Sequence, residues 1–460
     1  MINFWDFKAW GGFNVISVLL VSLLAASLLK RAFPILKASL IPTSVLGGGL
    51  LIVVAGIYKA ITGDIMFDTA FFGGNGTATL ELLTYHALAL GFIASTFKPA
   101  QEKMTKKRTI EIFNTGVTTV ATYLLQAVVG FGITMIAALV MDDFFEAAGV
   151  LLPFGYGQGT GQALNYGGIY ESEFGFTGGR SFGLTIAALG FLSASIGGVI
   201  HLNILRKQGK IQPKDPQAKL ILAGQIQSED ESPMQESMDK MTTQIALIAL
   251  SYMIAYLLML LLGCLLPGMK SVIYGFNFLL GVLAATLVKV VMNWMRKRKI
   301  IRREHRNYFL MTRASNFFFD LMVVAGIAAI RLSALERYWG IMLILGVAGL
   351  VITYTYNLFI ARKLFPEYPE EQFLTMYGML TGTASTGVIL LREIDGDFKT
   401  PAADNMVYQN FPAIVFGFPL MLLATLAPAK PLLTLGILVG FFLVMNVILF
   451  RSLIFRRKKK

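Results

Sequence analysis

The sequence predicts an all-α, polytopic membrane protein of about 11 spans, and three observations lead to this fold class. First, 55% of the 460 residues are hydrophobic and only 15% are charged, whereas about a quarter of a soluble domain is usually charged. Second, the apolar residues form runs long enough to cross a bilayer, which takes about 20 residues per helix. Third, most of the 40 Lys and Arg residues lie in short loops between these runs. This positive-inside pattern accounts for the net charge of +13 without a nucleic-acid partner.

Eleven runs have the length and composition of a membrane-spanning helix. In the first half of the chain they cover residues 12–30, 40–61, 80–97, 111–141 and 181–205. In the second half they cover residues 243–265, 271–295, 309–332, 338–361, 404–427 and 431–455. No small-residue cleavage site follows the first run before Lys30 and Arg31. We therefore interpret that run as a span and not as a signal peptide.

Two further segments, 147–170 and 372–391, have span length but are rich in glycine and small polar residues. If either segment crossed the membrane completely, the basic loops that follow would lie outside. The positive-inside pattern therefore predicts two re-entrant hairpins, one from each face, with the N-terminus outside and the C-terminus inside.

The number of spans and hairpins divides the chain into two repeats of opposite orientation. Residues 1–205 and 243–427 each contain five spans and one hairpin, and residues 206–242 read as a cytosolic linker. Residues 428–460 add one C-terminal span and a basic tail. Inverted repeats with broken segments are typical of secondary transporters, in which solute and ion sites lie at the breaks near the middle of the bilayer.

The first hairpin has glycine at alternate positions from 155 to 161, which lets the backbone turn without a Cβ clash. Freed N–H groups at a half-helix N-terminus attract anions, and carbonyl, hydroxyl and amide oxygens suit sodium. The alternative is a close-packed helix interface of small residues. We expect Thr160 to contribute to a sodium site. The expected substrate-binding residues are Gly157, Gln158, Gly159, Thr160, Gly161 and Asn165.

The second hairpin replaces most of the glycines by small hydroxyl residues and occupies the matching place in the second repeat. Here we expect Thr383, Ser385 and Thr386 to bind substrate, and Thr381 and Gly382 to bind sodium. The alternative is an ordinary helix in which Thr and Ser bond to their own backbone carbonyls.

A few ionisable residues lie within or beside the spans, where such residues suggest function. We expect Asp320, with Asn316 one turn earlier, to bind sodium; the alternative is a structural carboxylate paired with Arg313. Arg392, after the second hairpin, suits a substrate carboxylate, although a loop arginine neutralised by Glu393 or Asp395 is the alternative.

At this point the sequence resembles the bacterial sodium/glutamate symporters, in order and spacing, over nearly its whole length. Gly157 to Gly161 (G-Q-G-T-G) match the core of that family's G-G-H-G-T-G-type hairpin, and Ile41 to Gly49 resemble its I-P-x-x-V-x-G-G stretch. The resemblance implies import of an acidic amino acid with sodium, a homodimer, and an elevator-type motion of the hairpin-bearing domain. Sodium would be the coupling ion, and no organic cofactor is implied.

Three features depart from the family pattern: Gln158 stands at the motif histidine, the second hairpin reads T-G-T-A-S-T-G, and the last span is additional. Because of these departures, the substrate could instead be another small carboxylate, such as a di- or tricarboxylate.

Other functional classes find less support in the sequence. We find no paired-aspartate motif, no H-E-x-x-H and no P-loop, so neither an intramembrane enzyme nor an ATP-driven pump is expected. The single cysteine, Cys264, and the three scattered histidines predict no metal cluster. An ion channel is the remaining alternative function, because re-entrant loops also build ion filters.

Overall fold

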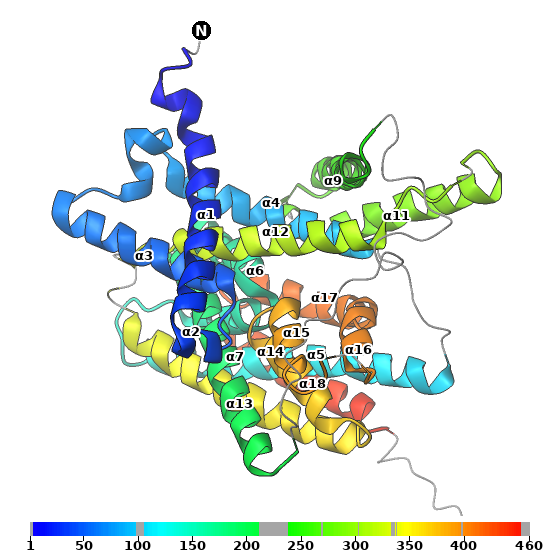
Figure 1. The fold of residues 1–460 in the computed structure, drawn as a ribbon. Helices are drawn as coiled ribbons and strands as arrows, with labels where there is room; N and C mark the ends of the chain where they lie inside the picture. Colours follow the sequence, from blue (N-terminus) through cyan, green and yellow to red (C-terminus); the bar gives the residue numbers. More distant parts are fainter. Residues whose placement is uncertain are drawn as a thin grey trace, which may run out of the picture. The chain divides into compact units, whose positions relative to one another are not determined.

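The structure, a computed structural model, is helical throughout the part that it describes (Figure 1). The described residues are 3–97, 105–210, 238–267, 270–301, 303–332, 336, 338–396 and 399–451. Most of the expected linker, residues 211–237, and the end of the basic tail, residues 452–460, lie outside these ranges. The helices form two compact units.

The first unit contains residues 1–81, 104–214 and 323–460. In chain order it starts with α1 (Phe7–Ala32), α2 (Pro34–Ala38), α3 (Thr43–Thr62), the 3₁₀ turns Met66–Asp68 and Ala70–Phe72, α5 (Lys106–Ala138), the 3₁₀ turn Glu146–Val150, α6 (Leu151–Phe174) and α7 (Gly179–Lys207). Its later helices are α13 (Trp339–Leu364), α14 (Pro369–Thr381), α15 (Ala384–Leu391), α16 (Ala402–Tyr408), α17 (Asn410–Leu426) and α18 (Pro431–Leu449).

The second unit contains residues 82–103 and 215–322. Its complete helices in the described residues are α9 (Lys240–Leu265), α10 (Lys270–Gly275) and α11 (Asn277–Lys297). Two helices are shared, because the division falls inside α4 (Gly76–Thr96) after Glu81 and inside α12 (Tyr308–Ala328) after Met322. Within this unit Ser315 donates a hydrogen bond to the carbonyl of Gly91, and His86 pairs with the Tyr252 hydroxyl at 2.7 Å.

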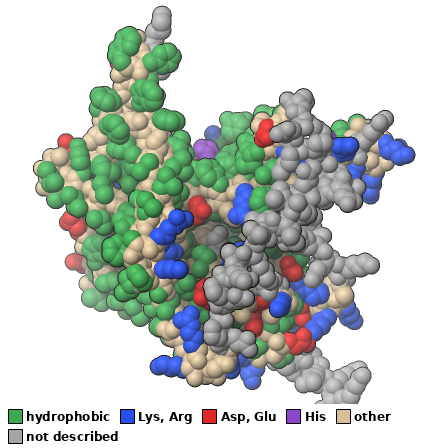
Figure 2. Space-filling view, viewed as in Figure 1, with side chains coloured by type: hydrophobic (Ala, Val, Ile, Leu, Met, Phe, Trp, Pro, Cys, Tyr) green, Lys and Arg blue, Asp and Glu red, His purple; other side chains and the backbone are tan. Residues whose placement is uncertain are grey.

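Ten helices in the described residues are long and apolar enough to cross a membrane, and the number rises to 11 if α16 and α17 form one bent span. This confirms the prediction of a multi-pass helical membrane protein. Large apolar side chains on α1 and α3 remain exposed, among them Val21, Leu24, Val53 and Ile57. Figure 2 shows hydrophobic side chains spread over this face. A surface of this kind is stable against lipid chains and costly against water.

Two of the expected spans are interrupted. The run 271–295 is divided at Phe276 into α10 and α11. The run 404–427 is divided at Gln409, and the axes on either side differ by 53°. Pro412 follows this break in the first turn of α17, where a proline is tolerated because its missing N–H has no helical partner there.

Candidate functional site

The first candidate segment reverses direction inside α6. Gly159 has φ 76° and ψ −170°, a conformation essentially restricted to glycine. On either side of it, the rings of Phe154 and Tyr166 stack with centroids 3.9 Å apart and an interplanar angle of 12°. In a straight helix these residues would be about 18 Å apart along the axis. The two halves of α6 therefore lie against each other.

The second candidate segment is interrupted at Gly382 and Thr383, between α14 and α15. Its two arms also approach closely, because a Cβ on Gly387 would lie 2.4 Å from the carbonyl oxygen of Thr375. A Cβ on Gly378 would lie 2.8 Å from the Cα of Gly387. Glycine at both positions allows the backbones to pack at this distance. The segment is therefore a helical hairpin with its turn at residues 382–383.

Helix α5 holds both hairpins near their turns. The Tyr123 hydroxyl donates a hydrogen bond of 2.9 Å to the carbonyl of Gly157 in the first hairpin. Three residues later, the Gln126 amide nitrogen donates a hydrogen bond of 3.0 Å to the carbonyl of Leu380 in the second. Positions i and i+3 lie on one face of a helix, so a single face of α5 holds a backbone carbonyl from each hairpin.

Helix α7 contacts the two hairpins from another direction. A Cβ on Gly190 would lie 2.6 Å from the Thr381 carbonyl and 3.2 Å from the Cα of Tyr156. Ser193, on the same helix, pairs through its hydroxyl with the Tyr156 hydroxyl at 2.8 Å and accepts a hydrogen bond of 2.7 Å from Tyr377 at its carbonyl. The same helical turn of α7 therefore contacts both hairpins. The two hairpin turns belong to one packed site.

A stripe of buried polar side chains runs along α5 toward this site. The Thr115 hydroxyl accepts a hydrogen bond from Gln372, Thr119 donates to Gln409, and Thr122 pairs with Asn357. Thr115, Thr119, Thr122 and Gln126 follow a spacing of four, three and four residues, which places them on one helix face. Neutral polar groups buried in a membrane protein find partners on neighbouring helices, and here those partners come from α13, α14 and the start of α17.

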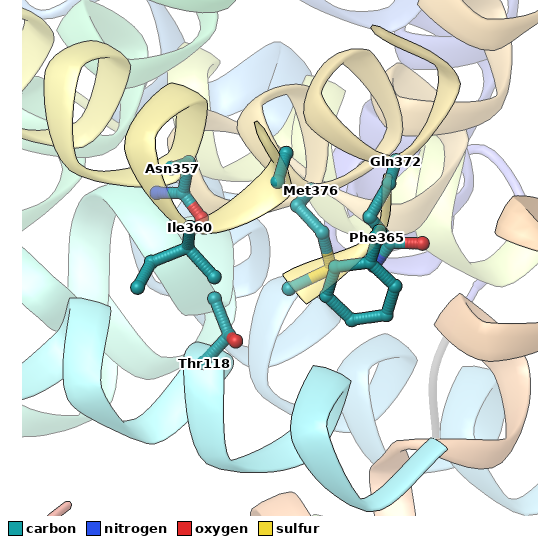
Figure 3. A pocket seen from close by; sticks show the side chains of 7 residues that line it. Thr118, Asn357, Ile360, Phe365, Gln372 and Met376 are labelled. Carbon is teal, nitrogen blue, oxygen red and sulfur yellow. The ribbon is translucent and has the colours of Figure 1, made fainter. Parts of the chain in front are cut away.

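A small gap lies beside this stripe, between Thr118 on α5, Asn357 and Ile360 on α13, and Gln372 and Met376 on α14 (Figure 3). Its empty volume is about 160 Å³, but its walls are too close to admit a water molecule. The gap is consequently a packing irregularity along the stripe.

The first arm of the second hairpin carries an ion pair at its start. His201 on α7 is buried and bonds Tyr354 through Nδ1 and Glu370 through Nε2, both at 2.8 Å. Lys210 and Arg362 lie 3.5 and 3.7 Å from the other Glu370 oxygen. The hydrogen bond from His201 is the main reason that the pKa of Glu370 lies below its usual value, and the two basic side chains add to this effect.

Most of the predicted hairpin residues lie at or beside the two turns. Thr160 is fully buried, and its side chain packs against Gly326 on α12. Gln158 and Asn165 are half-buried, and Asn165 is 3.4 Å from Gln162. The hydroxyls of Thr383 and Thr386 lie 3.4 Å apart, whereas the Thr381 hydroxyl donates to the Tyr377 carbonyl in its own helix. The side chain of Ser385 lies outside the described part of the structure.

Three predicted residues lie outside the two hairpin turns along the chain. Arg392 is exposed at the end of α15, about 13 Å along the helix from Thr383. The structure therefore does not bring its guanidinium to the turn. Asn316 and Asp320 are exposed on the portion of α12 that belongs to the second unit, and their part in a sodium site stays a prediction. Arg313 lies over the ring of Phe309, with 4.9 Å between the guanidinium carbon and the ring centroid.

Sequence reasoning missed several residues that build the site. The candidate residues named from the sequence do not include Tyr123, Gln126, Ser193 or Thr353. Gln126 and Tyr123 occur in an apolar run, where an amide and a hydroxyl three residues apart could have been recognised as a shared face. Ser193 and Thr353 carry no comparable local signal, since small hydroxyl residues are common in membrane helices.

Comparison with known proteins adds no identification. No protein-family model matches the chain, and no curated protein matches it. Among the described residues, no three His, Cys, Asp or Glu side chains lie close enough together to hold a metal ion.

Proposed function

We propose that this protein is a secondary active transporter that carries glutamate or a related acidic amino acid into the cell together with sodium. The observation that carries the proposal is the pair of contacts from α5: Tyr123 bonds the first hairpin and Gln126 bonds the second. Two interrupted helices that meet inside one unit of a membrane protein supply free backbone groups for an ion and a solute.

The two turns suggest a division of roles. Beyond Gly159 the second half of α6 begins with Thr160, and its N-terminal N–H groups favour a substrate carboxylate. Helix α14 ends at Thr381, and the carbonyls of its last turn favour a cation. Gln158, in the half-buried position beside the first turn, would contact the rest of the solute.

The proposal also covers the membrane, the topology and the transport cycle. We propose a bacterial cytoplasmic membrane, two inverted repeats, an outer N-terminus and an inner C-terminus. We also propose that the hairpin-bearing part moves against a fixed scaffold in an elevator-type cycle, and that two copies form a homodimer. The resemblance of Gly157 to Gly161 and of Ile41 to Gly49 to the sodium/glutamate symporters supports these points.

A second candidate is a sodium- or proton-coupled carrier of a di- or tricarboxylate on the same fold. The hydroxyl-rich second turn, with Thr383 and Thr386 side by side, favours this alternative because extra hydroxyl donors suit an additional carboxylate.

A thermal-shift screen of the purified protein in detergent tests the proposal. Amino acids and organic acids are added in sodium chloride and, separately, in choline chloride. We expect glutamate or aspartate to raise Tm in sodium and to have little effect in choline, since a ligand that binds only the folded state stabilises it. Stabilisation by citrate or malate in place of glutamate would favour the second candidate. A protein stabilised by no carboxylate would refute both.

A further inference from the structure

We propose that Gln126, Thr353 and the C-terminal end of α14 form a binding site for a monovalent cation. The inference rests on the proposed function, because this site would hold the coupling ion. Its ligands differ from those expected from the sequence, since none of Gln126, Thr353 and Leu380 belongs to the predicted sodium-binding set.

The end of α14 is an electrostatically favourable place for a cation. The helix ends at Thr381 in the interior of the first unit, where both Leu380 and Thr381 are fully buried. Carbonyl groups in the last turn of a helix lack helical partners and carry the negative end of the helix dipole. The last turn of α14 contains no basic residue to offset this charge.

The Gln126 side chain meets this helix end with its amide nitrogen. Its Nε2 donates to the Thr353 hydroxyl at 2.8 Å and to the Leu380 carbonyl at 3.0 Å. The oxygen atom of the same amide is buried and has no hydrogen-bond partner among the described residues. A buried acceptor without a partner is costly, and a cation coordinated by this oxygen would remove the cost.

Rotation of the Gln126 amide by half a turn exchanges its oxygen and nitrogen. Its Oε1 would then face the two oxygens that Nε2 now contacts, the Thr353 hydroxyl and the Leu380 carbonyl. The Thr353 hydroxyl can donate a hydrogen bond to Oε1, whereas the Leu380 carbonyl cannot. A cation between Oε1 and the Leu380 carbonyl would offset the repulsion of these two oxygens. The present orientation suits the ion-free site, because the amide N–H groups supply positive charge to the Thr353 and Leu380 oxygens. The rotated orientation suits the ion-bound site, because a bound cation would supply that charge.

The ligand types indicate the class of ion. One amide oxygen, one hydroxyl and one backbone carbonyl are hard, neutral donors, which suit an alkali cation. Calcium and magnesium sites in proteins usually include carboxylates, and none of the three residues supplies one. The site therefore fits a monovalent alkali cation.

The position of the site explains how an ion could order both hairpins. Leu380 lies two residues before the turn at Gly382, so a cation at its carbonyl would stabilise the second turn. Tyr123, three residues before Gln126, bonds the first hairpin at Gly157. A cation that fixes the Gln126 side chain would stiffen the same face of α5 that holds the first hairpin.

Equilibrium binding of radiolabelled sodium to the purified protein in detergent, with choline as the background cation and no organic acid, tests the site. We expect saturable sodium binding by the wild-type protein. Thr353→Val preserves the shape of the side chain but removes an oxygen ligand, and should weaken binding about tenfold or more, or about 1.4 kcal/mol. Thr353→Ser keeps the hydroxyl and should restore binding.

Two further variants complete the design. Gln126→Leu should weaken sodium binding at least as much as Thr353→Val does. Thr119→Val is the matched control, because it also removes a buried hydroxyl of α5 that bonds a glutamine, here Gln409, but lies outside the proposed site. Its sodium affinity should equal that of the wild type.

Three results would overturn the inference. One is wild-type protein that binds no sodium, and a second is unchanged affinity in both Thr353→Val and Gln126→Leu. Loss of binding in Thr119→Val as well would assign the effect to general loosening of the helices, and would also overturn it. Because no organic acid is present, a protein that binds sodium here but fails to bind any carboxylate would keep this site and lose the proposed substrate.

Discussion

Phe154 and Tyr166 stack face to face with ring centroids 3.9 Å apart, although they belong to a stretch that is helical on both sides of Gly159. Both side chains are fully buried. The Tyr166 hydroxyl also donates to the carbonyl of Met421 on α17. The stack therefore closes the two arms of the first hairpin on each other and joins one arm to the helix packed beside it.

Paired cysteines test this reversal directly. In a Cys264→Ser background, which removes the only native cysteine, we expect Phe154→Cys and Tyr166→Cys together to be joined by a short bifunctional thiol reagent. Intact-protein mass spectrometry would detect the bridge. Phe154→Cys with Phe174→Cys is the control, since Phe174 lies at the far end of the second arm. Absence of a bridge between residues 154 and 166 would contradict the hairpin.

Gly159→Ala should abolish transport without preventing membrane insertion. An added Cβ is strained at φ 76° and ψ −170°, at a cost of about 1–3 kcal/mol, and relief of that strain would straighten the turn. Uptake by reconstituted protein is the measurement. Gly132→Ala on α5 is the matched control, because a Cβ there meets no atom within 4 Å. Normal uptake by a well-expressed Gly159→Ala variant would mean that the turn is not part of the site.

Gly190→Ala should separate the hairpins from α7. The new methyl group would lie 2.6 Å from the Thr381 carbonyl and 3.2 Å from the Cα of Tyr156, and both of these are backbone atoms that cannot move cheaply. Overpacking of this kind costs about 1–3 kcal/mol. We expect a lower Tm and weaker sodium binding than in Gly132→Ala. Equal values in the two variants would show that the contact at Gly190 is not tight.

Glu370→Gln should lower the stability of the protein at neutral pH and have little effect in acid. The pKa of Glu370 is lower in the folded protein than its usual value, so its contribution is present above the unfolded-state pKa of about 4.3 and is lost as the pH falls through the folded-state pKa. Tm measured from pH 7 downward should therefore show the variant and wild type converging at low pH.

Glu367→Gln is the control for this pH series. Glu367 pairs with Lys107 on the surface, where both side chains are more than half exposed, and such pairs contribute about 0–1 kcal/mol. A Tm difference between Glu370→Gln and wild type that stays constant down to the lowest pH would contradict the assigned role of the carboxylate charge.

Much of the helical framework could be predicted from the sequence, because span length and the placement of Lys and Arg report directly on the bilayer. The turn at Gly159 lies within the expected run of alternate glycines, where only glycine adopts the required backbone angles. The break at Gly382 likewise falls in the expected T-G-T segment. In both cases the signal is local, since it depends on the conformations available to the residue itself.

The partners across the site could not be predicted, because they come from distant parts of the chain. Gln126 bonds Leu380, which is 254 positions away, and nothing near either residue specifies the other. The breaks at Phe276 and Gln409 were also missed, because hydropathy averages over a window and does not register a change of helix axis. Arg392 was chosen for its charge, but the helical arm that carries it points the end of α15 away from the turn.

Sodium-driven uptake tests the central claim most directly. Purified protein in proteoliposomes is given labelled glutamate with an inward sodium gradient, and then with equal sodium on both sides or with choline in its place. The account predicts accumulation above the external concentration with the gradient and only slow equilibration without it. Accumulation that persists when the sodium gradient is removed would contradict sodium coupling, and the absence of any glutamate entry would contradict the proposed substrate.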